Sequence, residues 1–239
     1  MAQGAGKNLE VKQFRYSADN LGYLIYSDLN AIAVDGGAVE DILSFLKSNN
    51  LSLKYVTNTH SHGDHTIGNQ ELLNTTDARF IDYQTLIKKG IKIDNQSVGV
   101  FKTPGHTADS IIFKIDTVIL TGDTLFTGKI GRCFSGDIKG FFNSIKLIME
   151  FPDNSVIYPG HDYVLEYMEF ARKFDADNRY IDEVISKYDP DLVKSTLGFE
   201  KKLNPFLRIN DKKIISFLEK RDLPTTTEYE RWESLISFM

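Results

Sequence analysis

The pattern of apolar and polar positions changes character along the chain. Up to about residue 164, short apolar runs bounded by turn residues, which are typical of strands, alternate with segments of helical periodicity. The expected strands cover residues 11–14, 23–26, 31–34, 55–56, 98–101, 118–120 and 156–158. Apolar residues at helical spacing predict one helix around Ile42, Phe45 and Leu46, and another around Phe141 and Ile145. This alternation predicts a mixed α/β body.

Beyond residue 164 the strand-like runs stop. The pattern there predicts helices over residues 164–174, 181–188, 212–219 and 227–238, joined by loops that contain proline. We therefore divide the chain into an α/β domain, residues 1–164, and a smaller helical region, residues 165–239.

Composition and charge exclude several classes of function. With 239 residues, 41% of them hydrophobic, the chain can bury a full core. A net charge of -5, with both signs spread along the chain, leaves no basic face for nucleic acid. Membrane partners and secretion are not expected, because no apolar run approaches roughly 20 residues and residues 1–7 do not form a signal sequence. The single cysteine, Cys133, suits a reducing compartment, so we expect a cytoplasmic protein.

Histidine and aspartate gather in one short stretch. Residues 59–65 read THSHGDH and place His60, His62, Asp64 and His65 within six residues. Side chains two residues apart point to different sides of a helix, so these four cannot converge as one helical face. We expect the stretch to lie in a loop.

Three further residues, His106, Asp123 and His161, each occupy a turn after an expected strand. Singly, each is more often a turn or core residue, but loops at one rim of a sheet can aim side chains at a common point. Five imidazoles and two carboxylates suit zinc, with iron or manganese as alternatives, rather than calcium or magnesium. Seven ligands are too many for one tetrahedral ion. They suffice for two divalent ions if one carboxylate bridges them and a water completes the site.

This set of residues resembles the metal motif of the metallo-β-lactamase superfamily, and the resemblance runs from about residue 14 to residue 163. It implies an αββα sandwich with the metals at one edge of two sheets. The residues that match the ligands of the first metal are His60, His62 and His106; those of the second are Asp64, His65 and His161; and the bridge is Asp123. Diiron oxygen reductases of the superfamily carry Glu at the position of His62, which disfavours that branch.

Further stretches resemble glyoxalase II, namely GDTLF at 122–126, HDY at 161–163, STLG at 195–198 and NPFLR at 204–208. The resemblance implies a catalytic domain at residues 1–164, a substrate-binding region at residues 165–239 and a small-molecule thioester substrate similar to hydroxyacylglutathione. Arg132, Phe134 and Tyr163 are the candidate substrate contacts. Phe134 stands where the family commonly has an aromatic hydroxyl, and WESL at 232–235 replaces a terminal Arg-x-x-Lys pair.

The expected reaction is attack on the thioester by a metal-bound hydroxide. Two cations lower the pKa of a bound water from about 15.7 toward 7. Asp64 would hold the second metal and orient the hydroxide, and Asp123 would bridge the two metals. A thiolate leaves without a general acid, which agrees with the absence of a sixth histidine. The alternatives are a persulfide dioxygenase, which uses one iron, a lactonase, and a non-catalytic metal-binding module. The complete ligand set disfavours the module, and NPFLR disfavours the dioxygenase.

Overall fold

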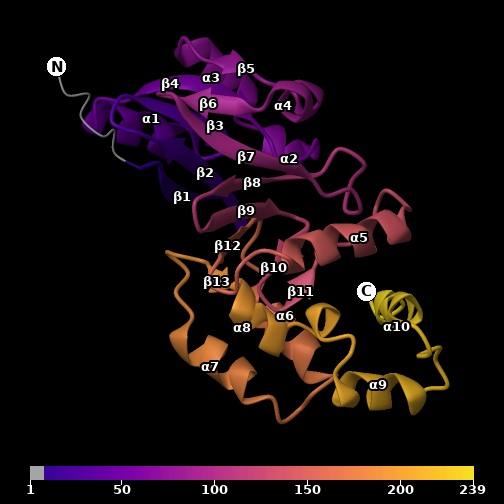
Figure 1. The fold of residues 1–239 in the computed structure, drawn as a ribbon. Coiled ribbons are helices and arrows are strands. Elements are labelled where there is room, and N and C mark those ends of the chain that lie inside the picture. Colours follow the sequence, from indigo (N-terminus) through magenta and orange to yellow (C-terminus); the bar gives the residue numbers. More distant parts are fainter. Residues whose placement is uncertain (1–7) are drawn as a thin grey trace.

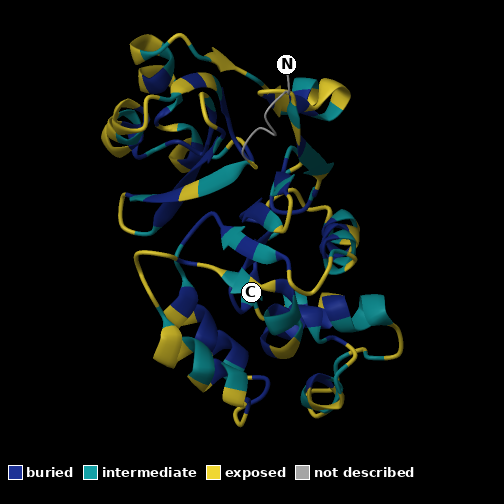
Figure 2. Ribbon diagram, turned by 60° about the vertical axis from the view of Figure 1, so that its left-hand side comes forward, coloured by how far each residue is buried: buried dark blue, intermediate teal, exposed yellow. Residues whose placement is uncertain are grey.

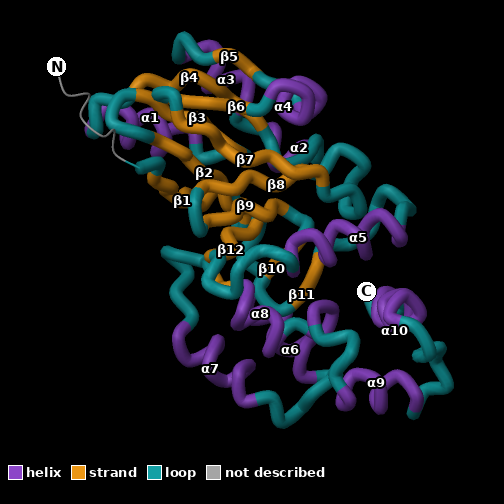
Figure 3. Tube along the Cα trace, in the orientation of Figure 1, coloured by secondary structure: helices purple, strands orange, loops and turns teal. Residues whose placement is uncertain are grey.

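Two stacked β-sheets form the body of the protein, and a group of helices lies below them in the views of Figures 1 and 3. The computed structural model describes residues 8–239, so residues 1–7, for which no signal sequence is expected, lie outside the described residues. The first sheet has the order β1 (Glu10–Tyr16), β2 (Asn20–Tyr26), β3 (Asn30–Val34), β4 (Ser52–Thr57) and β5 (Arg79–Phe80). The second has the order β13 (Ser195–Thr196), β12 (Val156–Pro159), β9 (Val118–Gly122), β8 (Ile111–Ile115), β7 (Gln96–Lys102) and β6 (Ile91–Ile93). A short hairpin joins β10 (Leu125–Phe126) to β11 (Lys129–Ile130).

Alternating side chains of the strands fill the space between the two sheets. On β2, Tyr23 and Ile25 share a buried cluster with Phe113 of β8 and Leu120 of β9. The intervening Leu24 belongs instead to the cluster on the outer face of the first sheet. Because successive strand residues point to opposite faces, β2 is apolar on both sides and is covered on both sides.

Helices cover the outer face of each sheet. Ile42 of α1 (Val39–Ser48) and Leu72 of α3 (Asn69–Thr75) pack with Leu24 on the first sheet. Phe141 and Ile145 of α5 (Ile138–Met149) cover the second. Two further helices, α2 (Gly63–Thr66) and α4 (Tyr83–Lys89), follow β4 and β5. The order of layers is helix, sheet, sheet, helix, which confirms the αββα sandwich.

Apart from the short strand β13, which pairs with β12, the C-terminal part of the chain is helical, as the sequence pattern predicts. It contains α6 (Val164–Arg172), α7 (Arg179–Lys187), α8 (Leu197–Leu203), the 3-10 turn Pro205–Leu207, α9 (Lys212–Glu219) and α10 (Glu228–Ile236). The helix expected at 212–219 begins and ends where expected, whereas α8 was not anticipated. Trp232 of α10 is fully buried against Phe141 and Phe206, with ring centroids 5.8 and 5.5 Å apart. Helices α6, α8, α9 and α10 thus share a core with the second sheet, and Figure 2 colours the buried residues dark blue.

Strand direction places the chemistry-bearing residues at one edge of the sandwich. β9 and β12 are parallel, and β8 is antiparallel to both β7 and β9, so β7, β9 and β12 all end at the same edge. His106, Asp123 and His161 follow these three strand ends. Among the residues that the structure describes, no helix has the length and apolar character that crossing a bilayer requires.

Candidate metal centre

The histidine cluster begins in a loop and ends in a helix. After β4, His60 lies in the loop and His62 has an extended backbone, with φ -62° and ψ 145°, at the position that caps α2. Asp64 and His65 lie on that single helical turn. The expectation that the whole stretch lies in a loop is therefore wrong for these two residues. The helix starts after His62, so the four side chains converge without having to share one helical face.

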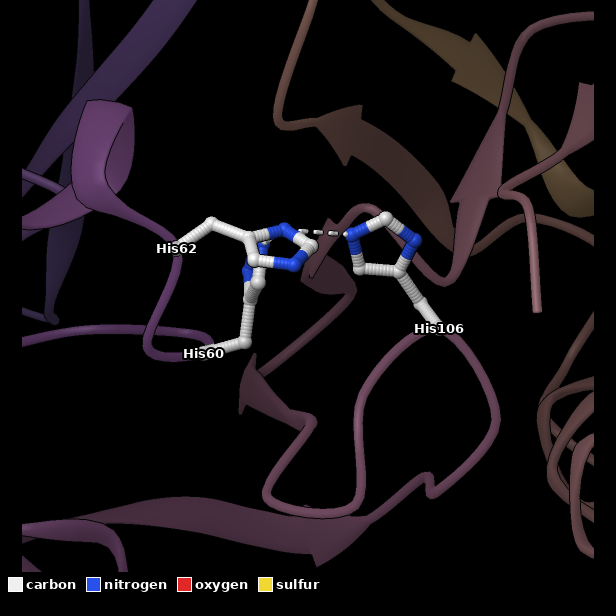
Figure 4. Close-up of side chains that lie close together, drawn as sticks. All are labelled: His60, His62 and His106. Carbon is white, nitrogen blue, oxygen red and sulfur yellow. Dashed lines mark hydrogen bonds between the residues drawn. The ribbon is translucent and has the colours of Figure 1, made fainter. Parts of the chain in front are cut away.

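Three imidazoles meet at one side of the site. His60 Nε2 lies 3.0 Å from His62 Nδ1, and His106 Nε2 lies 3.0 Å from the same nitrogen. Figure 4 shows His62 and His106 facing each other across the site, with His60 beside them. The ligand atoms of these three residues lie within 4.8 Å of one another, so one ion could contact all of them.

A second group lies beside the first. His65 Nε2 is 3.1 Å from His161 Nε2, and the Asp64 carboxylate is 3.3 Å from the same His161 nitrogen. These three residues also offer ligand atoms within 4.8 Å of one another. His65 is fully buried, whereas the Asp64 side chain is 47% exposed, so the second group opens toward solvent on the side of Asp64.

Asp123 stands between the two groups. Its Oδ2 lies 3.4 Å from Nε2 of His106 in the first group and 3.4 Å from Nε2 of His161 in the second. Its Oδ1 lies 3.4 Å from His65 Nε2, is buried, and makes no hydrogen bond within the described part of the chain. A Cβ at Gly160 would come within 2.2 Å of this oxygen, so glycine is needed there for the carboxylate to fit.

Four of the histidines are oriented by an oxygen on the far side of the ring. The Nδ1 contacts are 3.1 Å from His60 to Thr59, 3.0 Å from His65 to Asp35, 2.9 Å from His106 to the Arg132 carbonyl, and 2.9 Å from His161 to Asp19. A proton held on Nδ1 leaves the Nε2 lone pair directed at the site, as in metal-binding histidines generally. All four Nε2 atoms face the centre.

Sequence reasoning missed the residues that supply these outer contacts. Asp35 lies in an Asp-Gly-Gly segment that reads only as a turn, yet its carboxylate accepts hydrogen bonds from the Thr59 N–H and hydroxyl and contacts His65. Its backbone is left-handed, with φ 52°. Asp19, just before β2, contacts His161, and Asn20, the first residue of β2, contacts Asp64. Local sequence contains no signal for contacts that span 24 to 142 residues.

Burial and charge separate the two groups electrostatically. Burial, with the neighbouring His65, lowers the pKa of His60 to about 4, so that imidazole is neutral near pH 7. Burial also disfavours charge on His65, but Asp35 and Asp123 outweigh it and raise its pKa to about 11. Burial opposes ionisation of Asp123 too, yet the neighbouring His161 and His65 outweigh it and hold its pKa well below the usual range. The second group thus attracts positive charge.

These features fit divalent cations. Nitrogen lone pairs and carboxylate oxygens point inward, and five of the seven residues are buried. The buried Asp123 Oδ1 lacks a hydrogen bond within the described residues, and such an atom is costly unless a cation or donor contacts it. The set of nitrogen and oxygen donors is typical of zinc and of other transition metals.

The three candidate substrate contacts surround this centre at different depths. Phe134 is 60% exposed, and its ring centroid lies 5.5 Å from that of His62 and 5.3 Å from that of His106. Arg132 is exposed, with its guanidinium 5.5 Å from the centroid of the Phe134 ring. The Tyr163 ring stacks on His161 at 4.9 Å. All three lie beside the metal-type residues, and none of the three belongs to the two groups of ligands.

Comparison with known proteins agrees with this geometry. Residues 21–86 and 77–161 match the metallo-β-lactamase superfamily, and residues 162–235 match the hydroxyacylglutathione hydrolase C-terminus. Hydroxyacylglutathione hydrolase from Pseudoalteromonas translucida is 31% identical over 95% of each chain. The enzyme of that name from Pelagibacter ubique is 32% identical over 90% of this chain and 98% of its own.

The fold also has solved counterparts. The crystal structure of ETHE1 from Myxococcus xanthus superposes with a TM-score of 0.66 at 24% identity, covering 90% of this chain and 92% of that one. This likeness concerns the fold alone. The αββα sandwich, the two sequence matches and the full-length similarity agree with one another, and the chain belongs to the hydroxyacylglutathione hydrolase family of the metallo-β-lactamase superfamily.

Proposed function

We propose that this protein hydrolyses the thioester bond of a small-molecule substrate at a centre that holds two divalent ions. The observation that carries the proposal is the position of Asp123, 3.4 Å from a histidine nitrogen of each group. A carboxylate so placed can contact two ions at once. The similarity to hydroxyacylglutathione hydrolases along nearly the whole chain supports a thioester as the substrate.

The seven residues would divide between the two ions. The first ion would be held by His60, His62 and His106, the second by Asp64, His65 and His161, and both by Asp123. Two such ions lower the pKa of a shared water toward 7 and polarise a carbonyl. Zinc fits the donor set first, with iron or manganese as alternatives.

The protein itself orients the parts of the centre. Asn20 donates a hydrogen bond of 2.9 Å to the Asp64 carboxylate, and the Tyr16 hydroxyl donates to the Asp64 backbone carbonyl at 3.0 Å. These contacts fix the exposed carboxylate of the second group. Because a thiolate with pKa near 8.5 leaves without a proton donor, the chain needs no sixth histidine for a thioester.

We place the substrate over the exposed side of the centre. Phe134 offers an apolar face, Arg132 a positive charge and Tyr163 a phenolic hydroxyl. We propose that residues 1–164 form the catalytic domain and that residues 165–239 contribute to substrate binding. Arg231 is already engaged by the carbonyl of Thr225 and by Asn210, so it is a poor candidate for gripping a carboxylate of the carrier thiol. We propose that the protein works in the cytoplasm, which its single free cysteine, Cys133, supports.

A substrate panel tests this proposal. Metal-loaded protein is assayed with lactoylglutathione, an acyl-coenzyme A, a lactone and a phosphodiester, and oxygen uptake is followed with glutathione persulfide. We expect thioester cleavage, and the better of the two thioesters identifies the carrier thiol. The variant Asp41→Ala, which changes an exposed carboxylate on α1, serves as the control and should retain full activity. Brisk lactone opening or oxygen consumption without thioester cleavage would overturn the proposal.

A further inference from the structure

A buried carboxylate outside the seven metal-type residues holds the segment that carries His161. Asp162 directly follows this histidine, and its side chain is only 4% exposed. Its Oδ2 accepts a hydrogen bond of 2.5 Å from Arg15 Nη2 and one of 2.6 Å from the Tyr188 hydroxyl. Because a buried carboxylate is costly unless it is paired, these two donors stabilise Asp162 in its position. We call Arg15, Asp162 and Tyr188 the clamp.

The two donors of the clamp come from distant parts of the chain. Arg15 lies on β1, and Tyr188 directly follows α7 in the helical region. The same Arg15 nitrogen also donates to the Pro190 carbonyl at 2.7 Å. Burial, together with the Asp162 carboxylate, raises the pKa of Tyr188 to about 12, so its hydroxyl stays protonated and remains a donor near pH 7. The segment after α7 is thereby joined both to β1 and to the residue beside His161.

Backbone pairing links the position of Asp162 to that of His161. The Asp162 N–H donates to the Asp19 carbonyl at 2.8 Å, and the Leu21 N–H donates to the Gly160 carbonyl at 2.8 Å. His161 lies between these two hydrogen bonds, and its Nδ1 contacts the Asp19 carboxylate at 2.9 Å. The backbone is therefore fixed on both sides of this histidine, and the clamp holds the side of Asp162.

Tyr163, the residue after Asp162, contacts the same imidazole. Its ring stacks on that of His161 with the two planes 7° apart. Three consecutive side chains thus have different contacts, because His161 faces the metal centre, Asp162 turns toward Arg15, and Tyr163 covers the imidazole. Among the described residues, no hydrogen bond joins the clamp to the first group of histidines. The clamp therefore supports the second group alone.

We propose that Arg15 and Tyr188 are positioning residues for the second metal ion, acting on His161 through Asp162. This role rests on the two-ion centre proposed above, and it brings the helical region into metal binding, because Tyr188 belongs to that region. Contacts behind a metal ligand fix its orientation, and their loss lowers the affinity for the ion. Loss of the clamp should therefore weaken binding of the second ion and leave the first ion unaffected.

Stepwise titration of the metal-free protein with Zn²⁺, in competition with a chelator, tests this role. The step that is lost in Asp64→Ala identifies the second ion, because Asp64 belongs only to the second group. In Tyr188→Phe, which removes one hydroxyl, the affinity for the second ion should fall about fivefold, the scale of one hydrogen bond. Asp162→Ala removes the centre of the clamp and should lower this affinity by about 10–100-fold. The affinity for the first ion should stay unchanged in both variants.

A matched control makes the same substitution elsewhere on the same helix. The Tyr180 hydroxyl of α7 contacts Arg179 at the surface, so Tyr180→Phe should bind both ions as the native protein does. Denaturant unfolding shows that each metal-free variant is folded under the conditions of the titration. Two steps that Tyr188→Phe leaves unchanged, or an equal loss of affinity for both ions, would overturn the role of the clamp and keep the two-ion centre. A single step in the native protein would overturn both.

Discussion

The metal rim, formed by the seven metal-type residues, and the core around Trp232 are both largely buried. The rim consists of polar side chains, whereas the core consists of apolar ones. Around Asp123, titratable side chains face one another at 3.0 to 3.4 Å. Around Trp232, Phe141 and Phe206 meet in edge-on aromatic contacts. Burying polar groups destabilises the folded state unless they are paired, whereas burying aromatic rings stabilises it. The difference teaches that the apolar core stabilises the fold and that the rim uses this stability to hold a polar site.

Removing the central carboxylate should have the largest effect. Asp123→Ala takes away the carboxylate that faces both histidine groups, so turnover should fall below detection and bound metal below two equivalents per chain. Metal analysis by mass spectrometry, together with the thioester assay, checks this. Full activity with two equivalents of metal would contradict the distinction between rim and core, because metal binding and catalysis would then not depend on the central carboxylate.

A substitution in the core around Trp232 should lower the free energy of unfolding rather than the catalytic activity. Trp232→Ala removes a fully buried ring, and such changes cost roughly 3–5 kcal/mol of unfolding free energy. Denaturant unfolding measures the loss, and activity per folded molecule, measured well below the transition, should stay close to that of the native protein. Trp232→Phe is a milder substitution and should lower the free energy of unfolding by less. A fall in activity per folded molecule as large as that of Asp123→Ala would contradict the division of roles.

Glu200 offers a further test of the difference between rim and core, because it is an ionisable side chain that is fully buried away from the metal-type residues. Burial raises its pKa from 4.5 to about 7, so the folded state holds a proton that the unfolded state releases between these values. Stability should therefore fall as pH rises from 4.5 to 7, by roughly 3 kcal/mol at 1.36 kcal/mol per pH unit.

Glu200→Gln should lack this fall and should be more stable than the native protein at pH 8. The difference between the two proteins should shrink toward pH 4.5, where both carry an uncharged side chain at this position. Denaturant unfolding at a series of pH values measures it. Parallel pH profiles for the two proteins would show that Glu200 is not responsible.

The smallest of the four effects concerns a positioning residue. Asp19 contacts Nδ1 of His161 at 2.9 Å without facing the centre itself. Asp19→Ala should lower the affinity for the second ion by about 10–100-fold, which is the usual consequence of removing such a contact. The affinity for the first ion should stay unchanged. Competition with a chelator resolves the two ions as separate steps. Equal weakening of both ions would show that the two groups are not separately supported.

Much of the fold could be predicted because its periodicity is local. The helix Lys212–Glu219 has both an apolar face and a capping residue, Asp211, whose side chain accepts from the Lys213 N–H. β8 was missed because Ile111–Ile115 is buried on both faces and shows no alternation. α8 was missed because it has only seven residues, although Thr196 caps it.

The metal-type residues could be identified for a different reason. Histidine is rare, and its recurrence at strand ends is visible in the sequence. Asp35 and Asp19 were not identified, because aspartate in a turn is common and their importance comes from reaching His65 and His161 across the fold. Sequence thus indicates the residues that chemistry requires, and the structure adds those that hold them in place.

The central claim, that one carboxylate joins two ions, is tested most directly by a crystal structure of the metal-loaded protein with anomalous diffraction at the metal edges. We predict two ions, one beside His60, His62 and His106, the other beside Asp64, His65 and His161, with Asp123 in contact with both. A single ion, or two ions of which only one touches Asp123, would contradict it.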